Sequence, residues 1–396
     1  MQILSRSIVS LLLVPVIILT ACGTSAPAPA KPAETKPAAP AASPQTAPAA
    51  PVAAPAASPA AGASPAASPS PSPAAAAVAA PSKPTGPTVP IRWHVQENAS
   101  QAYIPALMKE KGIDAKYGIE VQMIGFSQNL VQWNAMRAGE SDISSGSFLD
   151  LLRQRNNGLK AQAIDTFSTY GNPIVTQASK PYTKIADLKG QKVGTPNATL
   201  LDWMIIRAAG KKAEGIDLEA DTQMQAAAPG LINGLLDKGD LDAALQYSDF
   251  TLAPVSQGKY KELTTVPKLM AAGGLDPEAL YLTFNLSDAW REKNAALVPA
   301  LVAAIEETRE LMMTDDSVWP ALAKRSGMED QSLMTAFIAK QRASFKAPYS
   351  EAKLAPTQTL IASLLETVGQ TPIGITAVDA AAFDFKSIEA AKGLRR

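Results

Sequence analysis

The chain has 396 residues, and its 36 lysine and arginine residues balance its 36 aspartate and glutamate residues. This neutral balance, without a basic cluster interleaved with aromatic residues, argues against nucleic-acid binding. The chain holds one histidine, His94, and one cysteine, Cys22. A single histidine argues against a histidine-based catalytic triad or metal site, and a single cysteine cannot form an internal disulfide.

The first residues have the pattern of an export signal. An apolar run from Ile8 to Leu19 follows Arg6 and is too short to span a bilayer as a helix. The run ends in Leu-Thr-Ala-Cys, which resembles the lipobox of bacterial lipoproteins, whose cysteine is acylated, for example with palmitate. The resemblance implies a signal peptide over residues 1–21 and a lipid anchor at Cys22, on the extracytoplasmic face of the cell membrane.

The next segment is of low complexity. Residues 24–86 are almost entirely alanine, proline and serine, with no apolar periodicity that could build a core. This composition favours extended polyproline II over packed structure. We therefore predict a disordered, lipid-anchored stalk over residues 22–87.

The body from residue 88 onward is long enough for two lobes. Its pattern alternates strand with helix, which predicts parallel βα units. We expect the first lobe to begin with residues 88–180. Its strands should lie at 91–95, 119–124, from 142, at 159–165 and at 174–177, and its helices at 100–111 and up to 138.

The alternation starts again in a second lobe, expected over residues 181–278. A helical turn is predicted at 185–188, strands at 192–194 and 243–246, and helices at 200–209 and 231–238. Two crossing strands, near 174–178 and 281–285, would join the lobes. Residues 279–396 should return to the first lobe, with amphipathic helices at 295–313, 332–338 and 356–368 packed on it.

Three motifs in the body resemble those of a known family. They are MRAGESDISSGSF from Met136, KIADLKGQKVGT from Lys184 to Thr195, and LINGLLDKGDLDAAL from Leu231 to Leu245. In this order, and behind a lipobox, they resemble the extracytoplasmic solute-binding lipoproteins of ABC importers. The group in question includes the nitrate, taurine, alkanesulfonate and thiamine-pyrimidine-precursor receptors.

The resemblance implies an α/β fold of two lobes, the type II periplasmic-binding-protein-like fold, with the helical C-terminal region on the first lobe. It implies a monomeric, high-affinity receptor that captures a small molecule between the lobes and delivers it to an ABC import permease in the membrane. On this interpretation the chain is not an enzyme and needs no cofactor or metal.

The ligand should lie at the carboxyl ends of the parallel strands, where loops of both lobes meet and helix amino termini present free N–H groups. Gly190, Asp142, Asp187 and Asp242 should instead serve turns and caps. The resemblance places a ligand loop at Ser144–Ser147. The candidates of the first lobe are Gln96, Glu97 and Asn98 after the first strand, Phe126 and Ser127 after the second, and Ser144, Ser145 and Ser147 after the third. Those of the second lobe are Thr195, Asn197, Thr199, Gln246, Tyr247 and Asp249.

Two classes of ligand stay open. Hydroxyl and amide side chains could bind an oxyanion such as sulfonate or nitrate with help from helix dipoles. Aromatic side chains and a carboxylate could instead hold a flat, nitrogen-rich ring. The residues for the second alternative are Glu97, Asp249, Tyr103, Phe126, Tyr170 and Tyr247.

Two other functions compete with the receptor. One is an enzyme like the thiamine-pyrimidine synthase of the same fold, which uses a histidine as a reactant. His94 lies in a predicted strand, where packing is the simpler role, and the related enzyme is cytosolic whereas this chain carries an export signal. The other is a stalked surface lipoprotein without a transport role, which would need an exposed apolar or repeat-built face, and the sequence shows no repeat at a solenoid period.

Overall fold

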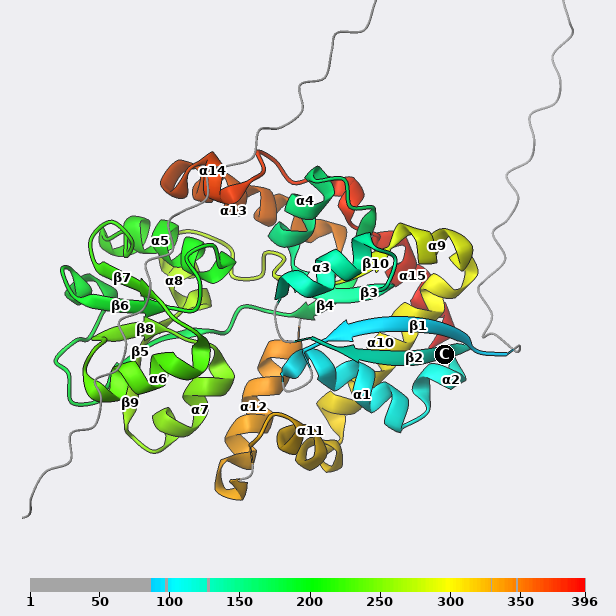
Figure 1. The fold of residues 1–396 in the computed structure, drawn as a ribbon, viewed down its shortest axis with the longest axis horizontal. Helices are drawn as coiled ribbons and strands as arrows, with labels where there is room; N and C mark the ends of the chain where they lie inside the picture. Colours follow the sequence, from blue (N-terminus) through cyan, green and yellow to red (C-terminus); the bar gives the residue numbers. More distant parts are fainter. Residues whose placement is uncertain (1–86, 97–98, 127–128, 329, 347, 396) are drawn as a thin grey trace, which may run out of the picture. The chain divides into compact units, whose positions relative to one another are not determined.

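The computed structural model describes residues 87–96, 99–126, 129–328, 330–346 and 348–395 (Figure 1). The predicted signal peptide, Cys22 and all of the predicted stalk except its last residue, Pro87, lie outside these residues. Two five-stranded sheets, each with its own helices, form two lobes. In the part of the chain that is described, no helix is both long and apolar enough to cross a membrane.

The first sheet is mixed. Its order is β2 (Ile119–Gly125), β1 (Val89–Val95), β3 (Ile143–Ser147), β10 (Leu282–Ser287) and β4 (Ala161–Ser168). β1 runs parallel to β2 and β3, whereas β10 runs antiparallel to β3 and β4. The strand that returns late in the sequence, β10, therefore lies between β3 and the edge strand β4.

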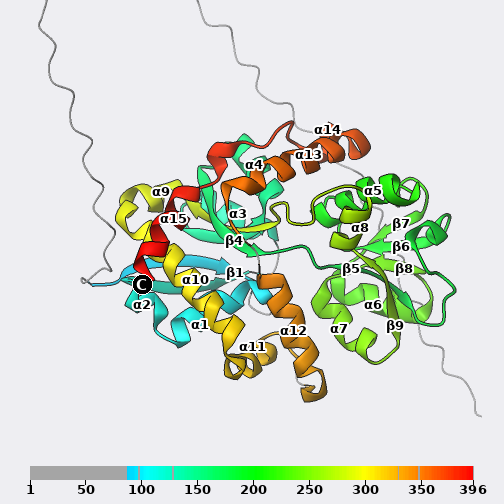
Figure 2. The same cartoon turned by 180° about the vertical axis from the view of Figure 1, so that it is seen from behind.

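Aromatic packing holds the first sheet to its helices. The rings of Trp93 and Phe284 lie 5.2 Å apart at nearly right angles, and Phe167 lies 5.5 Å from Phe284. All three side chains are buried. α4 lies above this sheet and α1 below it in Figures 1 and 2. The helices that follow the strands of this lobe are α1 (Tyr103–Glu110), α2 (Ile113–Lys116), α3 (Asn129–Arg137), α4 (Phe148–Asn156) and α9 (Asp288–Lys293).

The second sheet repeats much of this plan. Its order is β7 (Gln223–Ala226), β6 (Lys192–Thr195), β8 (Ala243–Leu245), β5 (Pro173–Gln177) and β9 (Tyr260–Thr265). β6 runs parallel to β7 and β8, and β5 runs antiparallel to β8 and β9. The helices of this lobe are α5 (Leu201–Glu214), α6 (Pro229–Lys238), α7 (Ser248–Ser256) and α8 (Val266–Ala272).

The two lobes share one helix–turn–strand arrangement, at positions 100 residues apart. Asp142 accepts the backbone N–H of Arg92, 2.8 Å away, and Asp242 accepts that of Lys192, 3.1 Å away. Trp93 pairs with Ile143 in the first sheet, and Val193 pairs with Ala243 in the second. The preceding turns use glycines with φ of 73° and 78° at positions 139 and 239. The prediction that these aspartates serve the scaffold is confirmed.

The structure corrects the predicted ligand loop of the first motif. Ser144–Ser147 lie inside β3 and not in a loop after it. The physical reason is β10, which pairs with this segment from Leu282↔Ser147 to Leu286↔Ile143. Because β10 begins only at Leu282, the sequence around Ser144 gives no local signal of this pairing.

The two crossings between the lobes also differ from the prediction. β5 is paired inside the second sheet and β10 inside the first, so neither strand is the connection itself. The chain passes between the sheets in the segments 169–172 and 273–281, which lie between β4 and β5 and between α8 and β10. We call these segments the crossovers.

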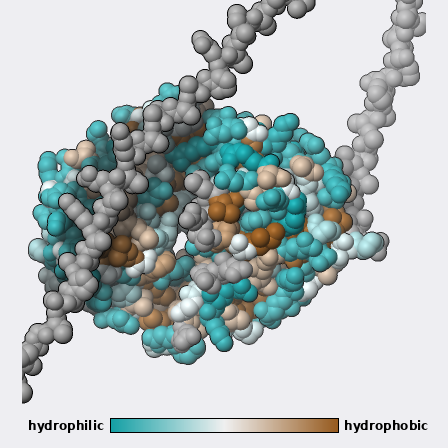
Figure 3. Space-filling view, in the orientation of Figure 1, coloured by the Kyte–Doolittle hydropathy of each residue, from teal (hydrophilic) through white to brown (hydrophobic). Residues whose placement is uncertain are grey.

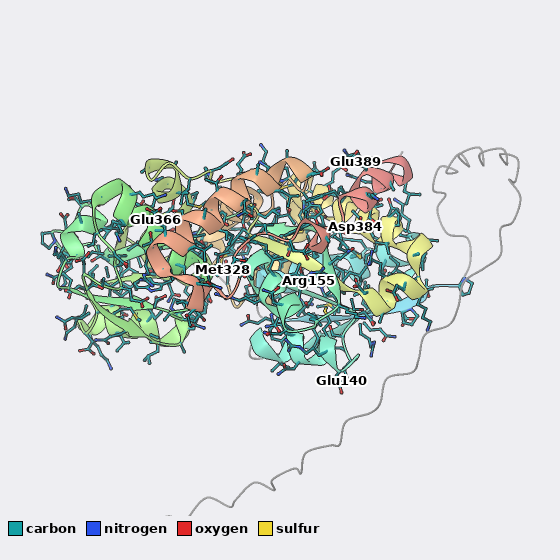
Figure 4. The ribbon with its side chains drawn as sticks, turned by 90° about the horizontal axis from the view of Figure 1, so that it is seen from above. Glu140, Arg155, Met328, Glu366, Asp384 and Glu389 are labelled. Atoms are coloured by element: carbon teal, nitrogen blue, oxygen red, sulfur yellow. The ribbon has the colours of Figure 1, made fainter. Side chains whose placement is uncertain are left out.

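The C-terminal helices contact both lobes. α10 (Val298–Thr314) packs on α1, α2 and α15 (Phe385–Leu394), as expected for the first lobe. α13 (Leu354–Val368) packs instead against α5 of the second lobe, which corrects that expectation. The apolar face of α13 includes the buried side chains of Leu360, Ile361 and Leu364, and α5 gives this helix a surface to pack on. In Figure 4, Glu366 of α13 lies beside the second lobe, and its carboxylate is 3.7 Å from Lys212 of α5. The remaining helices are α11 (Trp319–Arg325), α12 (Met334–Phe345) and α14 (Gln370–Ile373).

Candidate functional site

A cavity of about 760 Å³ lies between the lobes. Figure 3 shows the surface hollowed between the second lobe at the left and the first lobe at the right. Both lobes and α12 contribute to its wall, which is the arrangement of a site that encloses a small molecule.

Aromatic side chains make up much of the wall, and most of them are buried. The rings of Tyr170 and Tyr281, one from each crossover, lie 4.2 Å apart at the cavity wall. Trp133 lies directly on Gly146 of β3: a Cβ at Gly146 would be 2.7 Å from Trp133 Cζ2. Glycine is therefore needed at that position for the indole to lie against the strand. The aromatic residues of the wall are Trp133, Phe167, Tyr170, Tyr247, Phe250 and Tyr281.

Three buried polar atoms of the wall have no hydrogen-bond partner within the described residues. They are Ser145 Oγ of β3, Gln132 Oε1 of α3 and Gln101 Oε1. Ser145 and Gln132 are 0% and 1% exposed. An unpaired buried polar atom costs on the order of 1–3 kcal/mol, so such atoms at a cavity wall point to a bound group that satisfies them.

Charged side chains of the wall are few: Asp150, Asp249 and Lys340 among the described lining residues. Asp150 is engaged, because Ser147 Oγ donates to its Oδ2 at 2.7 Å and Arg153 Nη1 lies 3.1 Å from its Oδ1. Asp249 Oδ1 accepts only the Gln341 amide at 2.9 Å. By surface area the side chain of Asp249 is exposed, but the protein atoms that surround it in the cavity partly desolvate the carboxyl and raise its pKa.

Lys340 is the cation of the described wall. Its side chain is half-buried, and its ammonium makes no hydrogen bond or ion pair with any residue that the structure describes. Burial lowers the pKa of Lys340, and the nearby carboxylates of Glu262 and Asp249 act in the opposite direction.

A buried carboxylate joins the crossovers behind this wall. Asp202, in the first turn of α5, is 0% exposed. Its Oδ2 accepts from the hydroxyl of Tyr281 and from Asn172 Nδ2 at 2.9 Å, while its Oδ1 has no partner among the described residues. Burial raises the pKa of Asp202 to about 6, although both hydrogen bonds lower it. Asn172 Oδ1 also accepts the backbone N–H of Ser248, at 3.1 Å, so one polar cluster ties both crossovers to the second lobe.

The structure brings five of the predicted site residues to the cavity. Gln96, Ser145, Ser147, Tyr247 and Asp249 line it. Ser147 has a second role as the N-cap of α4, since its Oγ accepts from the N–H of Asp150 at 3.0 Å.

Six other predicted residues do not line the cavity. The Thr195 hydroxyl donates to Asn197 O, and Asn197 Oδ1 accepts from Thr199, so these three form a turn. The amide of Gln246 is occupied by Pro229 O and by the N–H of Tyr247. Phe126 extends the pairing of β1 and β2, and Ser144 is buried behind the wall. Glu97, Asn98 and Ser127 lie outside the described residues.

Several residues of the cavity wall were not predicted from the sequence. Gln132 and Trp133 precede the first motif on the same helix, so an amphipathic view of α3 could have found them. Asn172 lies in a crossover, and Lys340 and Gln341 lie on a C-terminal helix. No sequence signal connected that helix with the cavity. No group of three or more histidine, cysteine or acidic side chains is placed to hold a metal ion in the described part of the chain.

The chain is similar to known proteins in sequence and in structure. The sequence profile of the "NMT1/THI5 like" family matches residues 100–317. A protein of Brucella abortus with the provisional name "binding protein" is 26% identical over 164 residues, which are 41% of this chain and 50% of the relative. The chain thus spans about half the length of the curated relatives it matches.

Solved structures share the fold. The alkanesulfonate-binding protein SsuA from Xanthomonas axonopodis, bound to MOPS, is 14% identical with a TM-score of 0.60, over 76% of this chain and 99% of that one. The ligand-binding component of an ABC-type import system from Staphylococcus aureus is 12% identical with a TM-score of 0.59, over 78% and 100%. The desulfurization enzyme DSZB is 15% identical with a TM-score of 0.55, over 78% and 99%. At these identities the likeness establishes the two-lobe type II fold.

Proposed function

Because the chain belongs to the NMT1/THI5-like family, we propose that it is a solute-binding receptor, which captures a small molecule between its lobes and delivers it to an ABC import permease. It acts as a monomer, on the extracytoplasmic side of the membrane. Two structures of the same fold are named as binding proteins of this kind, one for alkanesulfonates and one from an ABC-type import system.

One observation carries the proposal: the cavity between the lobes has buried polar atoms that lack a partner. Ser145 Oγ and Gln132 Oε1 lie at its wall, and a bound molecule would supply their hydrogen bonds. The site is also shared by both lobes, so a ligand that contacts both must favour the closed form by its differential affinity.

The lipid anchor belongs to the same proposal. Acylation of Cys22 after cleavage, with residues 22–87 as a stalk, would hold the receptor near its permease. Replacing Cys22 by serine should move the protein from the membrane fraction to the soluble fraction, while ligand binding by the body stays unchanged. A Cys22→Ser variant that remains with membranes after a salt wash contradicts the anchor and leaves the receptor function untouched.

The ligand classes suggested by the sequence are an oxyanion and a flat, nitrogen-rich ring. Calorimetric titration of the body, residues 88–396, with sulfonates, nitrate, bicarbonate, pyrimidines and amines tests both. We expect one class to bind, and we expect Ser145→Ala to weaken that binding by about 1 kcal/mol, the usual size of one hydrogen bond.

The same titration separates the receptor from its competitors. A receptor returns its ligand intact, so mass spectrometry after long incubation should recover the ligand unchanged. A chemically altered ligand would favour an enzyme. The desulfurization enzyme DSZB, which has the same fold, is the reason to test this alternative. If a cooperatively folded body binds no compound of any class, the receptor proposal fails and the surface-lipoprotein alternative gains.

A further inference from the structure

The cavity presents two opposite charges that do not neutralise each other. Asp249 comes from α7 of the second lobe, and Lys340 comes from α12. Each influences the pKa of the other, so they are electrostatic neighbours, yet they form no ion pair. The third charge of the described wall, Asp150, is already satisfied by Ser147 and Arg153.

Each of the two groups lacks the partner that its charge requires. Asp249 accepts one hydrogen bond, from the neutral amide of Gln341, and Lys340 has no hydrogen bond among the described residues. Asp249 is exposed in the cavity and Lys340 is half-buried, so a ligand that fills the cavity would remove both groups from water, and a charged group removed from water is costly unless it is paired. In the described part of the chain, the one other carboxylate that acts on the pKa of Lys340 is that of Glu262, which lies on β9, is exposed and is absent from the lining.

We propose, on the basis of the receptor function above, that the cavity selects a zwitterion whose cationic group lies against Asp249 and whose acidic group lies against Lys340. A ligand with one charge would pair with one of these groups and leave the other desolvated. A ligand with both charges satisfies both groups, and this difference is the source of the selectivity.

The rest of the wall suits the body of such a molecule. Tyr247 and Phe250 flank Asp249 in the sequence, and Phe250 is 41% exposed although it lies at a cavity wall. Aromatic faces beside a carboxylate attract an organic ammonium group through their negative faces as well as through contact area. We therefore place the cationic, apolar part of the ligand at α7 and the acidic part at α12.

The test compares a zwitterion with its two halves. The probe is 3-(trimethylammonio)propanesulfonate, whose charges do not depend on pH, and the halves are propanesulfonate and propyltrimethylammonium. The stalk-free body is titrated with each by calorimetry. The expected result is that the zwitterion binds at least tenfold more tightly than either half. Equal affinities, or no binding of the zwitterion at millimolar concentration, overturn the proposal.

Two variants assign each charge. Asp249→Asn should bind propanesulfonate and the zwitterion equally well, because the site for the cation is lost. Lys340→Met should bind propyltrimethylammonium and the zwitterion equally well. Lys268→Met is the matched control, since Lys268 is exposed on α8 and does not line the cavity, and it should keep the full preference. If either cavity variant keeps the preference of the wild type, the assignment is wrong.

The titrations distinguish a failure of the zwitterion proposal from a failure of the receptor proposal. If a singly charged or neutral compound of the wider panel binds tightly while the zwitterion does not, the receptor stands and the zwitterion fails. If no compound binds at all, both fail.

Discussion

Asp202→Asn should change how the stability of the protein depends on pH. Asp202 has a pKa of about 6 in the folded protein against 3.8 as its ordinary value, chiefly because it is buried. An acid whose pKa is raised on folding holds its proton more tightly in the folded state. Its contribution to stability is therefore fully present below pH 3.8 and is lost as the pH rises through about 6.

The size of the effect follows from the two pKa values. Ionisation of Asp202 costs the folded state about 3 kcal/mol at pH 8 and roughly half of that at pH 5, since one pKa unit is 1.36 kcal/mol. Asparagine has nearly the same shape and can accept from Tyr281 and Asn172, but it has no charge. Its amide nitrogen would take the place of the unpaired Oδ1, a cost that does not vary with pH.

The quantity to measure is the difference in unfolding free energy between Asp202→Asn and wild type, from urea melts at pH 5 and pH 8. We expect this difference to shift in favour of the variant by about 1.4 kcal/mol between the two pH values. Asp217→Asn is the opposite control. Burial also raises the pKa of Asp217, but its bonds to Arg207 and to the backbone lower it overall, so its replacement should destabilise the protein at pH 8. A pH-independent difference for Asp202→Asn would refute the argument.

Three further predictions concern the cavity. Gly146→Ala should displace the Trp133 ring, shift its fluorescence and weaken ligand binding. Gly194 is equally crowded but does not line the cavity, so Gly194→Ala should lower the melting temperature and leave ligand affinity unchanged. Ser145→Ala should weaken binding without lowering the melting temperature of the unliganded protein, and Thr195→Ala, whose hydroxyl serves a turn, should do the reverse. Saturating ligand should reduce the radius of gyration of the stalk-free body in solution scattering, and an unchanged profile would argue against closure of the lobes.

The parts of the fold that sequence could predict are those with a local signal. The motifs at 136–148, 184–195 and 231–245 mark a helix, a turn and a buried strand, and the structure has these elements at those places. Asp142 and Asp242 were expected in the scaffold because their positions, after a glycine turn and before a buried strand, need a side chain that accepts backbone N–H groups.

The rest depends on contacts distant in sequence. The strand β7 (Gln223–Ala226) has the residues QMQA, which include no β-branched or aromatic side chain, and it forms because β6 lies beside it. The family resemblance placed a ligand loop at Ser144–Ser147, yet β10 pairs with all of these residues. The candidate site is harder to predict than the fold, because Lys340 and Gln341 reach the cavity only through the packing of α12.

The position of β10 has a consequence for the order in which the protein can be built. All strands of the second sheet lie between residues 173 and 265, so that sheet can form as soon as this segment has left the ribosome. β4 has no neighbouring strand in the first sheet other than β10, which ends at Ser287. A growing chain that stops short of β10 would thus carry a complete second sheet and an open first sheet, with the edges of β3 and β4 free to pair with another chain.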